Sequence, residues 1–103
     1  MSSPTVRSLK LLRDEGYLCQ VVERFNHFSK TRLDLFGFID ILAIRENEVL
    51  GVQATSRSNV SSRVAKITEH ENTAAVRKSG IRIEVWGWGK LKDGWCVKRV
   101  DLS

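Results

Sequence analysis

An aspartate interrupts the longest apolar stretch of this chain. The segment from Leu33 to Ile44 is apolar at both odd and even positions except at Asp34 and Asp40, a pattern typical of a strand covered on both faces. Burying a carboxylate without a partner costs several kcal/mol, so Asp40 requires either a bound cation or hydrogen-bond donors. Mg²⁺ favours carboxylate oxygens. The sequence alone leaves open whether Asp40 is a metal ligand or a hydrogen-bonded structural residue.

The position of the turn decides which residues of the following strand face Asp40. The segment 49–55 predicts a second buried strand, adjacent and antiparallel to the first. A turn at residues 46–47 sets Asp40 opposite Gln53, whereas a turn at residues 47–48 sets it opposite Thr55. Because alternate side chains of a strand share a face, both registers bring Asp40, Gln53 and Thr55 to one patch, unless a one-residue slip or a bulge intervenes.

The remaining periodicity predicts an α/β fold. Ser3 and Pro4 suit a helix N-terminus, and Gly16 suits the residue that follows a helix. Either Ser61 or Ser62 is expected to cap a second helical region. The expected elements are a helix at 4–15, strands at 17–24, 33–44 and 49–55, a polar loop at 25–32, helical segments within 61–79, and strands at 81–88 and 95–102. This order predicts a mixed central sheet flanked by helices.

Composition bounds the class of protein. The length of 103 residues fits one domain, so residues 1–103 are expected to form a single domain. No stretch reaches the roughly 18 uninterrupted apolar residues of a membrane span, and the N-terminus lacks a signal pattern, so a cytoplasmic location is expected. Cys19 and Cys96 are too few for a zinc site or a disulfide framework. The net charge of +5 is compatible with a polyanionic partner.

The segments Asp-Leu-Phe-Gly-Phe-Ile-Asp-Ile at 34–41 and Gly-Val-Gln-Ala-Thr-Ser at 51–56 resemble the PD-(D/E)XK nuclease superfamily. That superfamily includes archaeal Holliday-junction resolvases and VRR-type nucleases, and the two segments also look like small phage and prophage proteins assigned to it. The resemblance covers nearly the whole chain. It implies a restriction-endonuclease-like α-β-β-β-α-β core and a phosphodiesterase that uses Mg²⁺ or Mn²⁺.

The resemblance also implies roles for individual positions. The first metal-binding acid of the family falls on Asp40, the second acid position holds Gln53, and the lysine position holds Thr55. An early-helix glutamate of resolvase-like members falls near Thr5. The carbonyl oxygen of a glutamine binds Mg²⁺ without adding charge, and a threonine supplies no positive charge. The structural alternatives are a Gln53 that bridges backbone groups and a Thr55 that is a plain strand residue.

Other residues are candidates to supply the missing charges. Asp34 and Glu15 are candidate replacement carboxylates, and Asp34 is also a candidate ion-pair partner of Arg32. The following helix offers Arg63 or Lys66 as a replacement cation. Hydroxyls and cations after the second strand suit phosphate contacts, although a solvated polar surface has the same composition. The candidate nucleic-acid-binding residues are Arg57, Ser58, Asn59, Arg63 and Lys66.

These features support two functional hypotheses. The first is a metal-dependent endonuclease that hydrolyses DNA, with Asp40, Gln53, Thr55 and Asp34 as site residues and Asp40 and Gln53 as metal ligands. The second is a nucleic-acid-binding or assembly module that keeps the fold without cleavage. DNA is the expected partner, RNA is the alternative, and a homodimer is compatible with either. Trp86 and Trp88 are expected in the core, with base stacking as the alternative.

Overall fold

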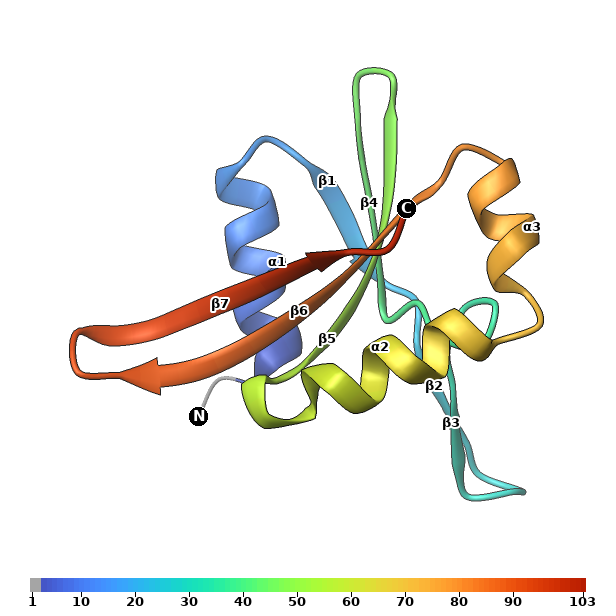
Figure 1. The fold of residues 1–103 in the computed structure, drawn as a ribbon, viewed down its shortest axis with the longest axis horizontal. Coiled ribbons are helices and arrows are strands. Elements are labelled where there is room, and N and C mark those ends of the chain that lie inside the picture. Colours follow the sequence, from blue (N-terminus) through green and yellow to red (C-terminus); the bar gives the residue numbers. More distant parts are fainter. Residues whose placement is uncertain (1–2) are drawn as a thin grey trace.

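The computed structural model describes residues 3–103 (Figure 1). Met1 and Ser2, which belong to the N-terminal stretch assessed for a signal pattern, lie outside the described residues. The described elements are α1 (Pro4–Asp14), β1 (Leu18–Val21), β2 (Arg24–Asn26), β3 (Thr31–Leu33), β4 (Ile41–Arg45), β5 (Glu48–Ser56), the 3₁₀ turn η1 (Arg57–Asn59), α2 (Val60–Glu69), α3 (Thr73–Lys78), β6 (Arg82–Leu91) and β7 (Gly94–Asp101).

A mixed central sheet with strand order β1-β4-β5-β6-β7 organises the fold. The β5–β6 pair is parallel and the other neighbouring pairs are antiparallel. The elements α1, β1, β4, β5, α2 and β6 follow the predicted α-β-β-β-α-β order, and β7 adds an antiparallel strand to the edge of the sheet. The prediction of an α/β fold with a mixed sheet flanked by helices is confirmed. Among residues 3–103, no helix combines the length and apolarity that crossing a bilayer requires.

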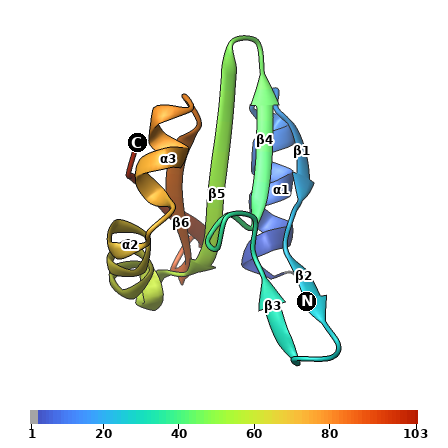
Figure 2. The ribbon, with the colours of Figure 1, turned by 90° about the vertical axis from the view of Figure 1, so that its right-hand side faces the viewer.

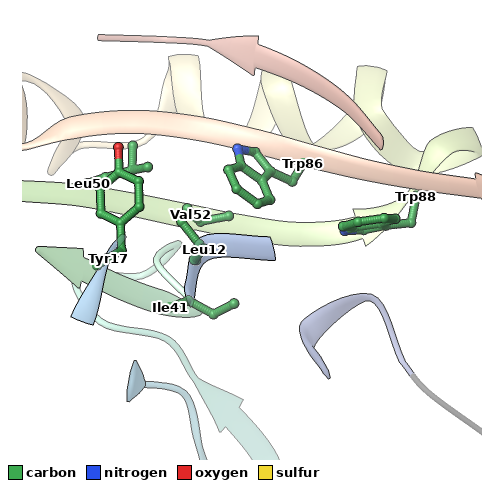
Figure 3. Packing of buried hydrophobic residues seen from close by; sticks show 8 residues of the cluster. Leu12, Tyr17, Ile41, Leu50, Val52, Trp86 and Trp88 are labelled. Atoms are coloured by element: carbon green, nitrogen blue, oxygen red, sulfur yellow. The ribbon is translucent and has the colours of Figure 1, made fainter. Parts of the chain in front are cut away.

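Helices cover both faces of the sheet. On one face, Leu12 of α1 packs against Ile41, Val52 and Trp86 (Figure 3). On the other face, Ile67 of α2 belongs to a core with Ile83 and Val85 of β6 and Val76 of α3. Burial of each large apolar side chain contributes about 1.5–3 kcal/mol, which fixes the two helical layers against the sheet.

The tryptophans follow the core-packing prediction in part. Trp86 and Trp88 are buried in the core on the α1 side of the sheet, and the Nε1 of Trp88 donates to Ser8 Oγ at 2.8 Å. Trp95 is half-exposed, with the guanidinium of Arg7 at 3.4 Å from its ring centre.

The sequence pattern misassigned the apolar segment before β4. Only Ile41–Arg45 is a central strand, whereas residues 34–40 form a compact loop in which Leu35 N donates to Ile39 O at 3.0 Å. Phe36 and Gly37 have φ angles of 56° and 94°, which a strand cannot accommodate. Phe38 and Ile39 are apolar because they cover the sheet as a buried loop.

Two further expectations require correction. The predicted loop at 25–32 is largely a β-hairpin formed by β2 and β3, which pair with each other and not with the central sheet (Figure 2). The helix α2 begins at Val60 after the turn η1, with Asn59 rather than Ser61 or Ser62 at its N-cap. At α1 the prediction is confirmed, because Ser3 Oγ accepts from Val6 N at 3.2 Å.

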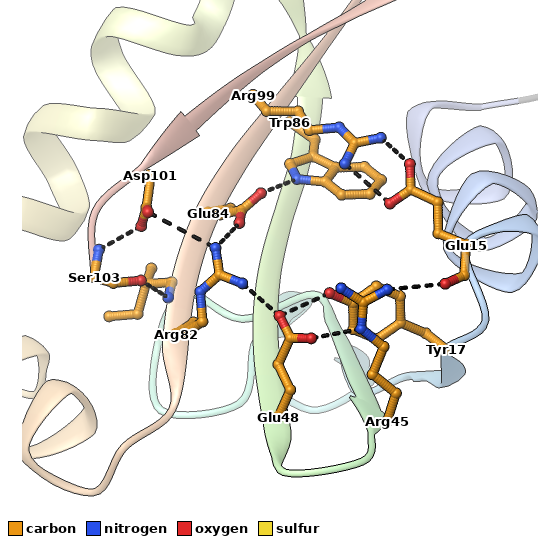
Figure 4. Close-up of polar contacts among 11 residues, drawn as sticks. Glu15, Tyr17, Arg45, Glu48, Arg82, Glu84, Trp86, Arg99, Asp101 and Ser103 are labelled. Atoms are coloured by element: carbon orange, nitrogen blue, oxygen red, sulfur yellow. Dashed lines mark hydrogen bonds and ion pairs between the residues drawn. The ribbon is translucent and has the colours of Figure 1, made fainter.

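A polar network ties four neighbouring segments together on the α1 side of the sheet (Figure 4). The carboxylate of Glu48 on β5 accepts from Tyr17 Oη at 2.9 Å and from Arg45 Nε at 2.6 Å, and it also accepts from Arg82 of β6. Arg82 donates in addition to the buried Glu84 at 2.8 Å. Because each charge has opposite-charge or hydroxyl partners, the half-buried carboxylates are tolerated without a cation there.

We expect Gly87→Ala to destabilise the protein by about 1–3 kcal/mol through overpacking. A Cβ at residue 87 would clash with Val60 Cγ2 and lie 3.2 Å from Arg57 Cα, which is backbone and cannot swing away. At Gly89 the nearest atom is Arg57 Cδ at 3.2 Å, on a flexible side chain. Gly89→Ala, two residues along β6, is therefore the matched control. Chemical denaturation of both variants checks this, and equal losses of stability would contradict the close packing of α2 on β6.

Candidate metal centre

The start of β4 positions the carboxylate of Asp40, the residue that directly precedes this strand. The turn lies at residues 46–47, so Ile41 pairs with Val52 and the first of the two predicted registers is present. Asp40 N donates to Val52 O at 3.0 Å, whereas the residues before Asp40 leave the strand and form the loop. This departure from the strand removes a backbone partner for Ala54 N, and Asp40 Oδ2 accepts from that N–H at 3.0 Å instead. Asp40 is thus fixed at 7% exposure with its second oxygen, Oδ1, left for another partner.

Three carboxylates meet at this point. Glu23, Asp34 and Asp40 each offer a carboxylate oxygen, and these oxygens lie within 4.8 Å of one another. Glu23 directly precedes β2 and Asp34 directly follows β3. Since Arg24 pairs with Leu33 in that hairpin, its two ends deliver Glu23 and Asp34 side by side to Asp40. Carboxylate oxygens are the ligands that Mg²⁺ and Mn²⁺ prefer.

The electrostatics of the cluster favour a bound cation. Burial, reinforced by the negative charges of Asp34 and Glu23, raises the pKa of Asp40 from 3.8 to about 7, while the N–H of Ala54 lowers it. In the absence of metal, the cluster therefore holds a proton near neutral pH. A divalent cation at this position would replace that proton, because it would stabilise the ionised carboxylates.

Gln53 lines the same cavity as the three carboxylates. Its Nε2 donates to Phe38 O at 3.0 Å, which anchors the loop that precedes Asp40. Its Oε1 is buried and has no hydrogen-bond donor within residues 3–103, and the side chain is only 2% exposed. Leaving a buried carbonyl unpaired costs about 1–3 kcal/mol. Gln53 therefore holds an unpaired oxygen of the type that hard cations accept, in a residue that lines the same cavity as Asp40.

Basic side chains border the acidic cluster. The cavity has a volume of about 210 Å³ and is lined by Thr5, Glu23, Arg32, Asp34, Asp40, Gln53, Ala54, Arg63 and Lys66. Arg63 and Lys66 project from α2, and Thr5 marks the start of α1. The two helices therefore frame the start of β4 from either side, with cations placed where a bound anion would approach the carboxylates.

Some predicted site residues lie elsewhere. Thr55 is buried on the same face of β5 as Gln53 but is not among the residues that line the cavity. Glu15 is committed to Arg99, whose Nη1 donates to Glu15 Oε1 at 3.0 Å, so it is not a replacement ligand. Arg57, Ser58 and Asn59 form η1 outside the cavity, where Asn59 Nδ2 donates to Ser56 Oγ at 3.0 Å.

Sequence reasoning missed Glu23. The residue falls inside the strand expected at 17–24, whereas β1 ends at Val21 and Glu23 directly precedes β2. The available signal was the hairpin itself, because extending the Arg24–Leu33 pairing by one position places residue 23 beside residue 34.

No protein-family model matches this chain, and no curated protein or solved structure matches it. The residues of the cavity therefore carry the functional inference by themselves.

We expect stability to depend on pH through Asp40. Its pKa is about 7 in the folded chain against an ordinary value of 3.8, so the folded state binds the extra proton and stability falls as pH rises between these values. A shift of about three units corresponds to at most roughly 4 kcal/mol. Asp40→Asn should flatten this slope while retaining the acceptor for Ala54 N. Melting temperatures at about pH 5 and about pH 8 without divalent metal test this.

Added Mn²⁺ should reverse the trend in the wild type. Because its ligands must be deprotonated, Mn²⁺ should raise the melting temperature more at about pH 8 than at about pH 5. Asp14→Asn, at an exposed carboxylate of α1, is the matched control and should behave as the wild type. A wild type whose melting temperature is indifferent to millimolar Mn²⁺ at both pH values would contradict the metal centre.

Proposed function

We propose that this chain is a metal-dependent endonuclease that hydrolyses DNA phosphodiester bonds. The observation that carries the proposal is the meeting of Glu23, Asp34 and Asp40 within 4.8 Å in a cavity that Arg63 and Lys66 also line. Carboxylates for a divalent cation next to side chains for a phosphate are the two requirements of metal-assisted phosphodiester hydrolysis. The α-β-β-β-α-β order of the core supports the PD-(D/E)XK type of arrangement.

Each group has a defined task in this proposal. Glu23, Asp34 and Asp40 would hold Mg²⁺ or Mn²⁺, with Gln53 Oε1 as a neutral donor. The bound cation would polarise the scissile phosphate. Arg63 and Lys66 would bind the phosphate oxygens and offset the negative charge that develops on them. The hydrogen bond from Ala54 N to Asp40 Oδ2 would keep the cluster in place during the reaction.

The proposal moves two family roles to new positions. Gln53 occupies the second acid position of the PD-(D/E)XK pattern, and the missing negative charge would come from Asp34 and Glu23 at the ends of the β2–β3 hairpin. Thr55 occupies the lysine position, and the positive charge would come from α2. The chemistry needs charges at given places in space, so the strand or helix that supplies them is secondary.

The second candidate is a nucleic-acid-binding module without cleavage. The neutral side chain of Gln53 and the position of Thr55 outside the lining of the cavity favour it. The three acids of the cavity are matched by Arg32, Arg63 and Lys66, so the cavity without metal does not strongly repel a phosphate. The two candidates differ only in whether a bound strand is cut.

A cleavage assay decides between them. With Mg²⁺ or Mn²⁺, the wild type should nick DNA offered in duplex, single-stranded and branched forms. Asp40→Asn should lower the rate at least about 100-fold, since a metal contributes several kcal/mol. Lys66→Ala should lower it about 10- to 100-fold, because one charge contact to the phosphate is lost.

Lys78→Ala, at the C-terminal end of α3, is the matched control and should leave the rate unchanged. A wild type that binds DNA but cuts none of these forms would refute the nuclease and leave the binding module.

A further inference from the structure

A hairpin extends from the body of the protein next to the acidic cavity. The strands β2 and β3 pair only with each other, and they project away from the central sheet (Figures 1 and 2). The turn is ordered by its own polar groups: Asn26 Oδ1 accepts from Phe28 N at 2.9 Å, and Ser29 Oγ lies 2.7 Å from Thr31 Oγ1. The segment is therefore an ordered β-hairpin, called the arm below, and not an irregular loop.

The arm exposes apolar side chains that the body does not cover. Phe28 at the tip is fully exposed, Phe25 is 50% exposed, and Leu33 is also exposed. Phe25 is in edge contact with His27, with ring centres 5.1 Å apart. Large apolar groups gathered on a projecting segment mark a site of interaction.

The positive charge of the arm indicates an anionic partner. Residues 24–33 contain Arg24, Lys30 and Arg32 and no aspartate or glutamate. Cations interleaved with aromatic rings complement a strand of phosphates and bases. The same basic charge disfavours a second copy of the arm, because like charges would face each other.

The arm is joined directly to the proposed catalytic cavity. Glu23 and Asp34 are the residues at its two ends, and Arg32 lines both the arm and the cavity. Phe28 is five residues beyond Glu23 along the chain. At roughly 3.3 Å per residue, the tip reaches about 16 Å from the cluster, or about five base steps of a duplex.

We infer that the β2–β3 hairpin is a nucleic-acid-binding arm whose Phe28 stacks on an unpaired base about five steps from the phosphate held in the acidic cavity. Arg24, Lys30 and Arg32 contact the phosphates between the two points. An aromatic side chain stacks on any base that is not already stacked within a duplex, so the arm selects strands with unpaired bases next to paired ones. The link to cleavage rests on the proposed nuclease function; the binding does not.

Binding in EDTA tests the arm without any cleavage. Dissociation constants are measured by fluorescence anisotropy for labelled duplexes of equal length, one fully paired and one with a short unpaired gap, each made as DNA and as RNA. Phe28→Ala should weaken binding to the gapped DNA about 10-fold and leave binding to the paired DNA nearly unchanged. Phe28→Trp should retain the affinity.

The tip of the β6–β7 hairpin supplies matched controls. Leu91 is 52% exposed there, and Leu91→Ala should change neither affinity. Lys30→Ala should weaken binding to both duplexes and lower the slope of log affinity against log salt concentration by about one phosphate contact. Lys92 is also exposed, and Lys92→Ala should change neither the affinity nor the slope.

Three results would refute the nucleic-acid-binding role of the arm. They are equal effects of Phe28→Ala and Leu91→Ala, no preference of the wild type for gapped DNA, or a preference confined to RNA. Sedimentation of a dimer that Phe28→Ala dissociates, with DNA affinity unchanged, would assign the tip to self-association. If binding depends on Phe28 but no DNA is cut, the binding arm is supported and the nuclease proposal is refuted. If Phe28→Ala cuts DNA at the wild-type rate and gapped DNA is bound no better than paired DNA, the nuclease proposal is supported and the binding arm is refuted.

Discussion

The hydrogen bond from Ala54 N to Asp40 Oδ2 is the interaction on which the candidate site depends. It completes the hydrogen bonding of β5 at the place where β4 begins, so the protein needs an acceptor there for structural reasons. A carboxylate serves as that acceptor, and its burial then raises the pKa of Asp40 to about 7. The residue that precedes strand β4 thus also creates a local need for either a proton or a cation.

Glu48 and Glu84 have arginine partners, whereas Asp40 lies beside two further carboxylates. Arginines and hydroxyl or indole donors pair with the carboxylates of Glu48 and Glu84. The charges of these two carboxylates on that side of the sheet are therefore compensated within the protein. At Asp40 the neighbours from the hairpin are two further acids, which intensify the demand. The contrast between the two sides marks the candidate site, because strongly perturbed pKa values concentrate at functional sites.

Local signals in the sequence were sufficient for much of the architecture. The Ser3 cap, the glycine at the end of α1 and the alternating pattern of β6 each predict the observed element. Both registers that the sequence allowed predicted Asp40, Gln53 and Thr55 on one patch, and Asp40 and Gln53 do line one cavity, whereas Thr55 does not. Lys66 and Arg63 followed from their position in the helix after the site.

The missed features are those that depend on packing rather than on periodicity. The apolar residues at 34–40 are equally compatible with a buried strand and a buried loop, and only the positive φ angles at Phe36 and Gly37 distinguish them. The short strands β2 and β3 carry weak patterns, since their side chains are largely exposed on an arm that covers no core. Missing that hairpin concealed Glu23, whose role arises from pairing between segments distant from any motif.

Crystals soaked with Mn²⁺ and measured at the manganese absorption edge test the central claim most directly. The account predicts an anomalous difference peak between the carboxylates of Glu23, Asp34 and Asp40, with Mn–O distances of about 2.1–2.2 Å, near those of other small hard cations. The same crystals of Asp40→Asn should lose that peak. A wild-type map without a peak at this cluster, while Mn²⁺ binds at other carboxylates of the chain, would contradict the account.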